Sequence, residues 1–232
     1  MPTRHRPSGD LGRLTHPGPY TFSRPACGAR AVSPYRLRLS VRHAVPFAVQ
    51  SKIKNRKSKM PSFAFFDSPS FLADALRARF TPPVALVGVG NALRGDDGFG
   101  PAVVASLRGT AGLALFDVQA VPESFLVPIV SSGASSVLFV DAADLGADPG
   151  RVALVPAERL AEVDVSTHAI SLSLIAEAIQ GLARGQTGRD LPCALLAVQP
   201  ADLSTPDRLS PAVSAAVRLA SDALRLFARA DG

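Results

Sequence analysis

Residues 84–100 read VALVGVGNALRGDDGFG, an unbroken apolar run that leads into a glycine-rich turn and two adjacent aspartates. An apolar run of this length that ends in glycine is typical of a strand buried on both faces of a parallel sheet. A helix is expected to follow from about Gly98 to Leu107. The order of strand, tight turn and helix predicts an α/β fold with the turn at the carboxyl end of the first strand.

Strands and helices are expected to alternate on both sides of this stretch. The expected strands are 84–90, 113–120, 136–142, 150–157 and 193–200. The further expected helices are 68–80, 123–132 (short, with a proline inside), 168–183 and 210–229. This alternation predicts an α/β protein of the phosphorylase/hydrolase-like type, a three-layer α/β/α sandwich with a mostly parallel five-stranded sheet. In such sheets, ligands bind outside the carboxyl ends of the strands.

The first 59 residues differ in charge from the rest of the chain. They contain 13 of the 25 Lys and Arg residues and one acid, whereas residues 60–232 contain 12 basic and 18 acidic residues. The acidic balance of the second part argues against a nucleic-acid partner, which needs a basic face. We expect residues 1–59 to be a disordered basic tail and residues 60–232 to form a single domain.

Three interpretations of the tail remain open. The first is a targeting peptide, although the apolar segment of a secretory signal is missing. The second is a basic interaction arm, and the third is translated upstream sequence. We favour the third, with Met60 as the start, because every organised element begins after it. The two cysteines, Cys27 and Cys193, form no CxxC motif, and no apolar run approaches the roughly 18 residues of a membrane span. We therefore expect a cytoplasmic monomer without a membrane partner.

Polar residues at the ends of the predicted strands define a candidate site. Asp97 follows the first strand, and Asp141 ends the third. His168, the only histidine after residue 60, stands where the helix after the fourth strand is expected to begin. Asp97, Asp141 and His168 can therefore converge at the carboxyl edge of the sheet. One imidazole and two carboxylates suit a borderline divalent metal such as Ni²⁺ or Zn²⁺.

Each of these residues also has a purely structural interpretation. Either aspartate of the 96–97 pair can cap the helix that follows, a role worth about 1 kcal/mol. We favour capping for Asp96, because neighbouring side chains at a helix start point about 100° apart and Asp97 is assigned to the site. Asp141 can close a turn by accepting backbone amides. His168 can be a first-turn helix residue, where the helix dipole favours the neutral imidazole that metals require.

The glycine turn fits neither of the common phosphate-binding motifs. It departs from G-x-G-x-x-G, because its third glycine comes late and two acids follow, and the Gly-Lys-Ser/Thr of a P-loop is absent. The nucleophile elbow G-x-S-x-G is absent as well. A nucleotide-binding domain stays an alternative that nucleotide titration would test. Proteolysis by two close carboxylates that share a proton also stays open.

Four separated blocks of the sequence resemble, in order and spacing, the [NiFe]-hydrogenase maturation proteases. The blocks are GVGNALRGDDGFG, VDAADLGADPG, STHAISL, and AVQPADL followed by LSPAV. VPES at 121–124 and STHAISLSLIAEAI are most similar to the type that processes the formate-linked hydrogenase. The resemblance covers roughly residues 84–228. It implies an endopeptidase that removes a C-terminal peptide from the large-subunit precursor of the hydrogenase after nickel has been inserted.

The resemblance assigns the family's metal-contacting and catalytic residues to Asp97, Asp141 and His168. Nickel is then expected to arrive with the substrate and not as a resident cofactor. The residues expected to support the site are Gly88, Gly90, Asn91, Asp96, Glu123 and Gln199. Scission through a metal-polarised carbonyl or metal-activated water and carboxylate-assisted attack by water both remain open.

One segment departs from the family pattern. After the second strand the family usually has Gly-Thr before a P-E-N block, whereas residues 119–124 read QAVPES. The departure leaves the identity of the client open. It also keeps a second hypothesis, in which the protein is a non-catalytic checkpoint or chaperone that binds the loaded precursor.

Overall fold

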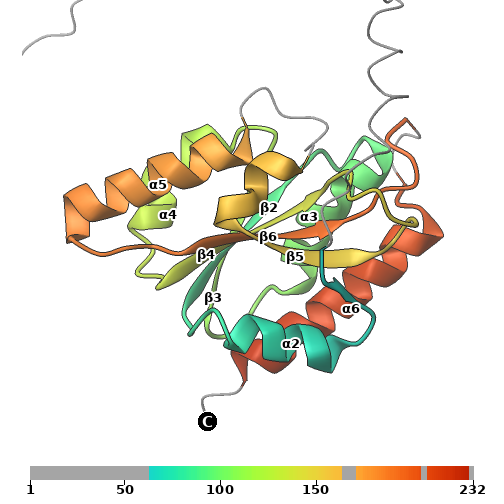
Figure 1. Cartoon of the computed structure of the whole chain (residues 1–232), viewed down its shortest axis with the longest axis horizontal. Coiled ribbons are helices and arrows are strands. Elements are labelled where there is room, and N and C mark those ends of the chain that lie inside the picture. Colours follow the sequence, from blue (N-terminus) through green and yellow to red (C-terminus); the bar gives the residue numbers. More distant parts are fainter. Residues whose placement is uncertain (1–62, 164–170, 205–207, 230–232) are drawn as a thin grey trace, which may run out of the picture. The chain divides into compact units, whose positions relative to one another are not determined.

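A computed structural model describes residues 63–163, 171–204 and 208–229 (Figure 1). The predicted tail at 1–59 and the boundary at Met60 lie outside these ranges. Within them, six strands form one sheet in the order β1-β5-β6-β4-β2-β3. The strands are β1 (Phe65–Phe66), β2 (Val84–Val89), β3 (Leu113–Gln119), β4 (Ser136–Ala142), β5 (Val152–Pro156) and β6 (Cys193–Val198).

The mostly parallel sheet that the sequence predicts is confirmed. β3, β2, β4 and β6 run parallel to one another, while β5 pairs antiparallel with β6. The sheet has one strand more than expected, because the two residues of β1 pair antiparallel with β5. A ladder of two residues is too short to produce a periodic pattern, so the sequence gives no signal for it.

Helices cover both faces of the sheet, as expected for a three-layer sandwich. They are α2 (Pro69–Arg77), α3 (Phe99–Ser106), α4 (Leu126–Val130), α5 (Leu172–Thr187) and α6 (Pro211–Ala228), with 3₁₀ turns η1 (Gly95–Gly98), η2 (Pro122–Phe125) and η3 (Ala157–Glu162). Figure 1 shows α4 and α5 together on one face and α2 and α6 on the other. Among the described residues, no helix has the length and apolarity needed to cross a membrane.

The central strands are buried because each of their faces packs on a separate core. Every residue of β2, β4 and β6 is buried. On β2, Val87 packs in the cluster that contains residues of α4 and α5, whereas Leu86 packs with residues of α2, α3 and α6. The apolar runs in the sequence therefore correspond to strands with no solvent-facing side.

α5 begins and ends four residues later than expected. Ser171 is its N-cap, with Oγ accepting a hydrogen bond from Ser173 N at 3.3 Å. The helix ends at Gly188, whose φ of 67° is the left-handed conformation that glycine adopts readily. With Ser171 as its N-cap, the helix starts at Leu172. His168 itself lies outside the described residues.

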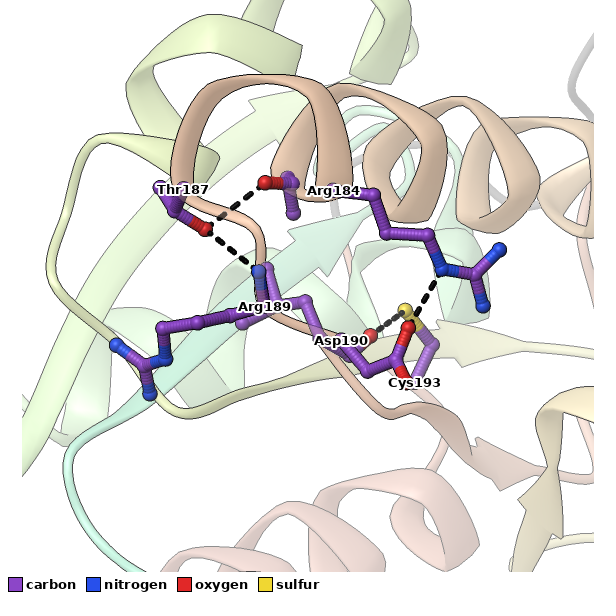
Figure 2. A network of polar contacts seen from close by, with 7 residues as sticks. Arg184, Thr187, Arg189, Asp190 and Cys193 are labelled. Carbon is purple, nitrogen blue, oxygen red and sulfur yellow. Dashed lines mark hydrogen bonds and ion pairs between the residues drawn. The ribbon is translucent and has the colours of Figure 1, made fainter.

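Short-range polar contacts fix the turn from α5 into β6 (Figure 2). Thr187 Oγ1 donates to Ala183 O at 2.8 Å and accepts from Arg189 N at 3.3 Å. Arg184 Nε donates to Asp190 Oδ1 at 2.5 Å. The turn is therefore held by its own side chains.

Cys193, the first residue of β6, is a buried free thiol. Its Sγ donates to Leu191 O at 3.3 Å. Burial raises the pKa of the thiol to about 12, although a hydrogen bond with Gln180 acts in the opposite direction. A thiol that stays protonated is a poor nucleophile, so Cys193 has the character of a core residue.

Candidate functional site

The chain leaves β2 at Gly90, which lies between the two candidate aspartates. Its φ is 120°, a conformation that favours glycine. A Cβ at this position would lie 1.9 Å from the carbonyl oxygen of Asp97 and 3.5 Å from Oδ1 of Asp141. Gly90 therefore lets the backbone of Asp97 and the side chain of Asp141 approach the same point at the carboxyl edge of the sheet.

Two further glycines let α3 lie directly on the sheet. A Cβ on Gly100 would lie 2.2 Å from Val89 O and 2.3 Å from Val140 O. A Cβ on Gly88 would lie 2.6 Å from Val104 Cγ2. These contacts seat η1, which carries both aspartates of the 96–97 pair, against the ends of β2 and β4. The glycines thus serve close packing of helix on sheet.

Asp97 is almost completely buried, with 1% of its surface exposed. Its Oδ2 accepts a hydrogen bond from Asn91 N at 2.9 Å. Asn91 Oδ1 in turn accepts from Leu93 N at 2.9 Å, which fixes the turn after β2. The side chain of Asn91 therefore shapes the turn, and its backbone amide orients the carboxylate of Asp97.

Asp141 lies near the end of β4 and is completely buried. Its Oδ1 accepts from Ala142 N at 2.7 Å, a contact with its own neighbour that closes no turn. Burial and then the nearby charge of Asp97 raise the pKa of Asp141 well above its ordinary value, while the amide of Ala142 acts in the opposite direction. Asp97 and Asp141 are therefore electrostatically coupled inside the protein.

We expect Asp141→Asn to stabilise the protein at neutral pH and to flatten its pH dependence. The folded-state pKa of Asp141 lies above its ordinary value of 3.8, so the folded chain binds a proton that the unfolded chain releases. The contribution of this group to stability is therefore greatest below that value and is lost as the pH rises through the folded pKa. Asn keeps the acceptor for Ala142 N and does not ionise.

Urea unfolding of both proteins at several pH values between about 4 and 8 would test this. If the free energies of unfolding of the parent and of Asp141→Asn fall by the same amount as the pH rises, Asp141 does not hold the extra proton.

Asp96 is buried as well, but its side chain points away from the pair. Its Oδ1 accepts from Ser210 N at 2.6 Å, and its Oδ2 accepts from Ala201 N at 2.8 Å and Asp202 N at 3.0 Å. Its backbone amide donates to Asp202 O at 3.0 Å. Asp96 therefore joins the glycine turn to the loop after β6 and to Ser210, the N-cap residue of α6.

The prediction that Asp96 caps the following helix is wrong. The N-cap positions of η1 and α3 are Arg94 and Gly98, and neither makes a side-chain cap hydrogen bond. Three amides from a crossing segment satisfy the buried carboxylate instead. The predicted divergence of the two neighbouring side chains is confirmed, because Asp96 faces the 201–210 segment and Asp97 faces Asn91.

Two further residues expected to support the site are Gln199, which follows β6, and Glu123, which lies in η2 after β3. Gln199 Oε1 accepts from Leu145 N at 2.7 Å and from Ala147 N at 3.3 Å, so it holds the loop that follows Asp141. Glu123 is exposed in η2. Among the residues that the structure describes, no three His, Cys, Asp or Glu side chains are grouped closely enough to hold a metal. The predicted trio needs His168, which is outside them.

Gln119, at the end of β3, has a conformation that the sequence does not reveal. Its φ is 51°, in the left-handed region, and its carbonyl oxygen accepts from Gly90 N at 2.9 Å. The β2–β3 register shifts between Gly88 and Val89, a bulge that brings Gln119 opposite Val89. The sequence marks only the segment 119–124, as one that departs from the pattern of the resembling family.

Gln119→Gly is expected to raise stability by about 0.5–1 kcal/mol, because it removes the cost of a left-handed non-glycine residue. The matched control is Ala120→Gly, where φ is not left-handed and added backbone freedom should lower stability. Denaturant midpoints of the two variants and the parent would show whether Gln119→Gly is more stable than the parent and Ala120→Gly less stable. Equal losses in both variants would show that residue 119 is unstrained.

Comparisons with known proteins agree with this fold. The family model described as hydrogenase maturation protease matches residues 105–225. Hydrogenase 3 maturation protease of Escherichia coli (strain K12) is 29% identical over 98 residues, which is 41% of this chain. The chain spans 63% of the length of that curated relative.

Two solved structures are similar over most of their length. The crystal structure of a [NiFe] hydrogenase maturation protease HycI from Thermococcus kodakarensis KOD1 has a TM-score of 0.57 and 27% identity, covering 69% of this chain and 99% of that chain. The solution structure of an endopeptidase HycI from Escherichia coli has a TM-score of 0.51 and 24% identity, covering 58% and 84%. The second likeness concerns the fold alone.

Proposed function

The chain belongs to the hydrogenase maturation protease family, and we propose that it is an endopeptidase that removes the C-terminal extension of the nickel-loaded large-subunit precursor of a [NiFe] hydrogenase. The observation that carries this proposal is the buried Asp97–Asp141 pair at the carboxyl edge of the sheet, built around Gly90. Membership of the family supports the reaction class, and the pair supports the use of a metal-bearing substrate.

The chemistry of the pair suits a cation that the substrate brings. Burial, and then repulsion by the nearby carboxylate of Asp97, raises the pKa of Asp141. A divalent cation on the client supplies the opposite charge, and oxygen ligands from both residues can contact it. In this proposal His168 is the third ligand. A client without metal leaves the repulsion in place, so the pair favours loaded over unloaded precursor.

The same two residues can serve the hydrolysis. Cleavage joins a water oxygen to the peptide carbonyl carbon, breaks the C–N bond and places one proton on the leaving nitrogen. In the carboxylate-assisted alternative, in which Asp141 does not bind the cation, its raised pKa favours the protonated form and we assign it to deliver that proton, while Asp97 accepts the proton that the attacking water loses. Asn91 N and Ala142 N orient the two carboxylates for this work.

Incubation of the full chain with nickel-loaded and nickel-free precursor would test the proposal. Intact mass spectrometry should show a shortened precursor in the nickel-loaded sample alone. Cleavage in both samples would contradict the role of nickel. Binding of the loaded precursor without a shortened product would favour the non-catalytic checkpoint.

A further inference from the structure

We propose that β3 is a docking edge, on which an extended segment of the client precursor adds to the sheet as a further strand that leads to the Asp97–Asp141 pair. This inference rests on the proposed function, because it takes the precursor as the occupant. β3 lies on the opposite side of β2 from β4, the strand that carries Asp141. The proposed docking edge is therefore separate from the aspartate pair.

β3 is the last strand on its side of the sheet, and within the described residues it pairs with β2 alone. Val84 N donates to Gly112 O at 3.0 Å, while the register partner of Val84 is Leu113. In a parallel ladder this pattern directs the backbone groups of alternate residues to β2 and those of the residues between them outward. Leu113, Leu115 and Asp117 therefore present N–H and C=O groups to the free edge.

The side chains of β3 are also incompletely covered. Its first four residues are half-buried, whereas every residue of β2 and β4 is buried. Leu113 and Leu115 pack at the border of the core that contains α2, α3 and α6, and Phe116 packs at the border of the other core. An added strand would cover apolar side chains on both faces while it pairs with the outward backbone groups.

The continuity of this edge with the candidate site argues for the client and against a second copy of the chain. β3 ends at Gln119, whose carbonyl oxygen accepts from Gly90 N, and Gly90 adjoins both Asp97 and Asp141. Neighbouring strands lie about 4.8 Å apart, so the end of β4 is about 14 Å from a strand added beside β3. Extended chain rises about 3.3 Å per residue. About four or five residues beyond the docked part therefore reach the pair.

The test compares Asp117→Pro with Asp117→Ala. Both remove the same exposed carboxylate, and the proline also removes one outward N–H without touching the ladder to β2. We expect Asp117→Pro to raise KM for the nickel-loaded precursor about tenfold over Asp117→Ala, with kcat unchanged, since one backbone hydrogen bond is lost. Equal melting temperatures would show that both variants fold.

Equal KM values in two folded variants would overturn the proposal while the proposed function stands. If Asp117→Pro fails to fold, Leu113→Pro against Leu113→Ala repeats the comparison at the other end of the strand. Sedimentation of the parent as a dimer and of the proline variant as a monomer would assign the edge to a second copy. Absence of any shortened precursor with the parent chain would reject the proposed function, and this inference with it.

Discussion

Asp97→Asn is expected to slow processing of the nickel-loaded precursor by at least about 100-fold, since loss of groups that only support metal ligands already costs about 10–100-fold. The variant should melt at the same temperature as the parent or higher. Asn keeps the size of the side chain and an acceptor for Asn91 N, but it removes the negative charge that raises the pKa of Asp141. Activity and stability should therefore change in different directions.

The matched control is Asp144→Asn. Asp144 is an exposed aspartate in the loop after β4, where its Oδ1 accepts from Gly146 N at 3.0 Å. An asparagine preserves that contact, so processing should continue at the parent rate. Precursor cleavage and thermal melting of both variants would be measured side by side. A normal rate for Asp97→Asn would show that Asp97 has a structural role only.

Asp96→Ala is expected to lower the free energy of unfolding by about 3–5 kcal/mol, because its buried carboxylate accepts three hydrogen bonds and a hydrogen bond to a charged group contributes about 1.5–3 kcal/mol, less where water reaches the donor. The expected fall in melting temperature is about 6–20 °C. This loss is larger than that of a helix cap, because the amides of Ala201, Asp202 and Ser210 belong to a crossing segment that would lose its connection to the glycine turn.

Asp96→Asn should give an intermediate loss. The carboxamide oxygen of the asparagine still accepts hydrogen bonds on one side. Its NH₂ group, on the other side, faces a backbone N–H and cannot accept from it. Urea unfolding of the three proteins at one pH would establish the order. A loss of less than about 1 kcal/mol for Asp96→Ala would mean that water replaces the carboxylate, and the junction would then not be needed for folding.

The central part of the fold could be predicted because it depends on local pattern. The apolar runs of β2 and β4 identify buried parallel strands, and the rule that ligands lie at the carboxyl edge brings Asp97 and Asp141 together from residues far apart. Neither step requires knowledge of side-chain conformation.

The other features depend on contacts that no local pattern encodes. The partners of Asp96 lie 105–114 residues further along the chain, and their amides are brought to it by the path of a loop. The left-handed backbone of Gln119 follows from a bulge in the ladder between β2 and β3. The sequence predicts a start of α5 at residue 168, four residues too early, because several residues in this stretch are able to begin a helix. The structure has Ser171 as the N-cap.

The junction at Asp96 also has a consequence for the order of events during synthesis. The ribosome makes the glycine turn more than 100 residues before Ser210, whose amide the turn needs. Until Ser210 has left the exit tunnel, the carboxylate of Asp96 lacks a partner that lies more than 100 residues further along the chain. A nascent chain that still lacks Ser210 thus cannot complete the junction between the glycine turn and the start of α6.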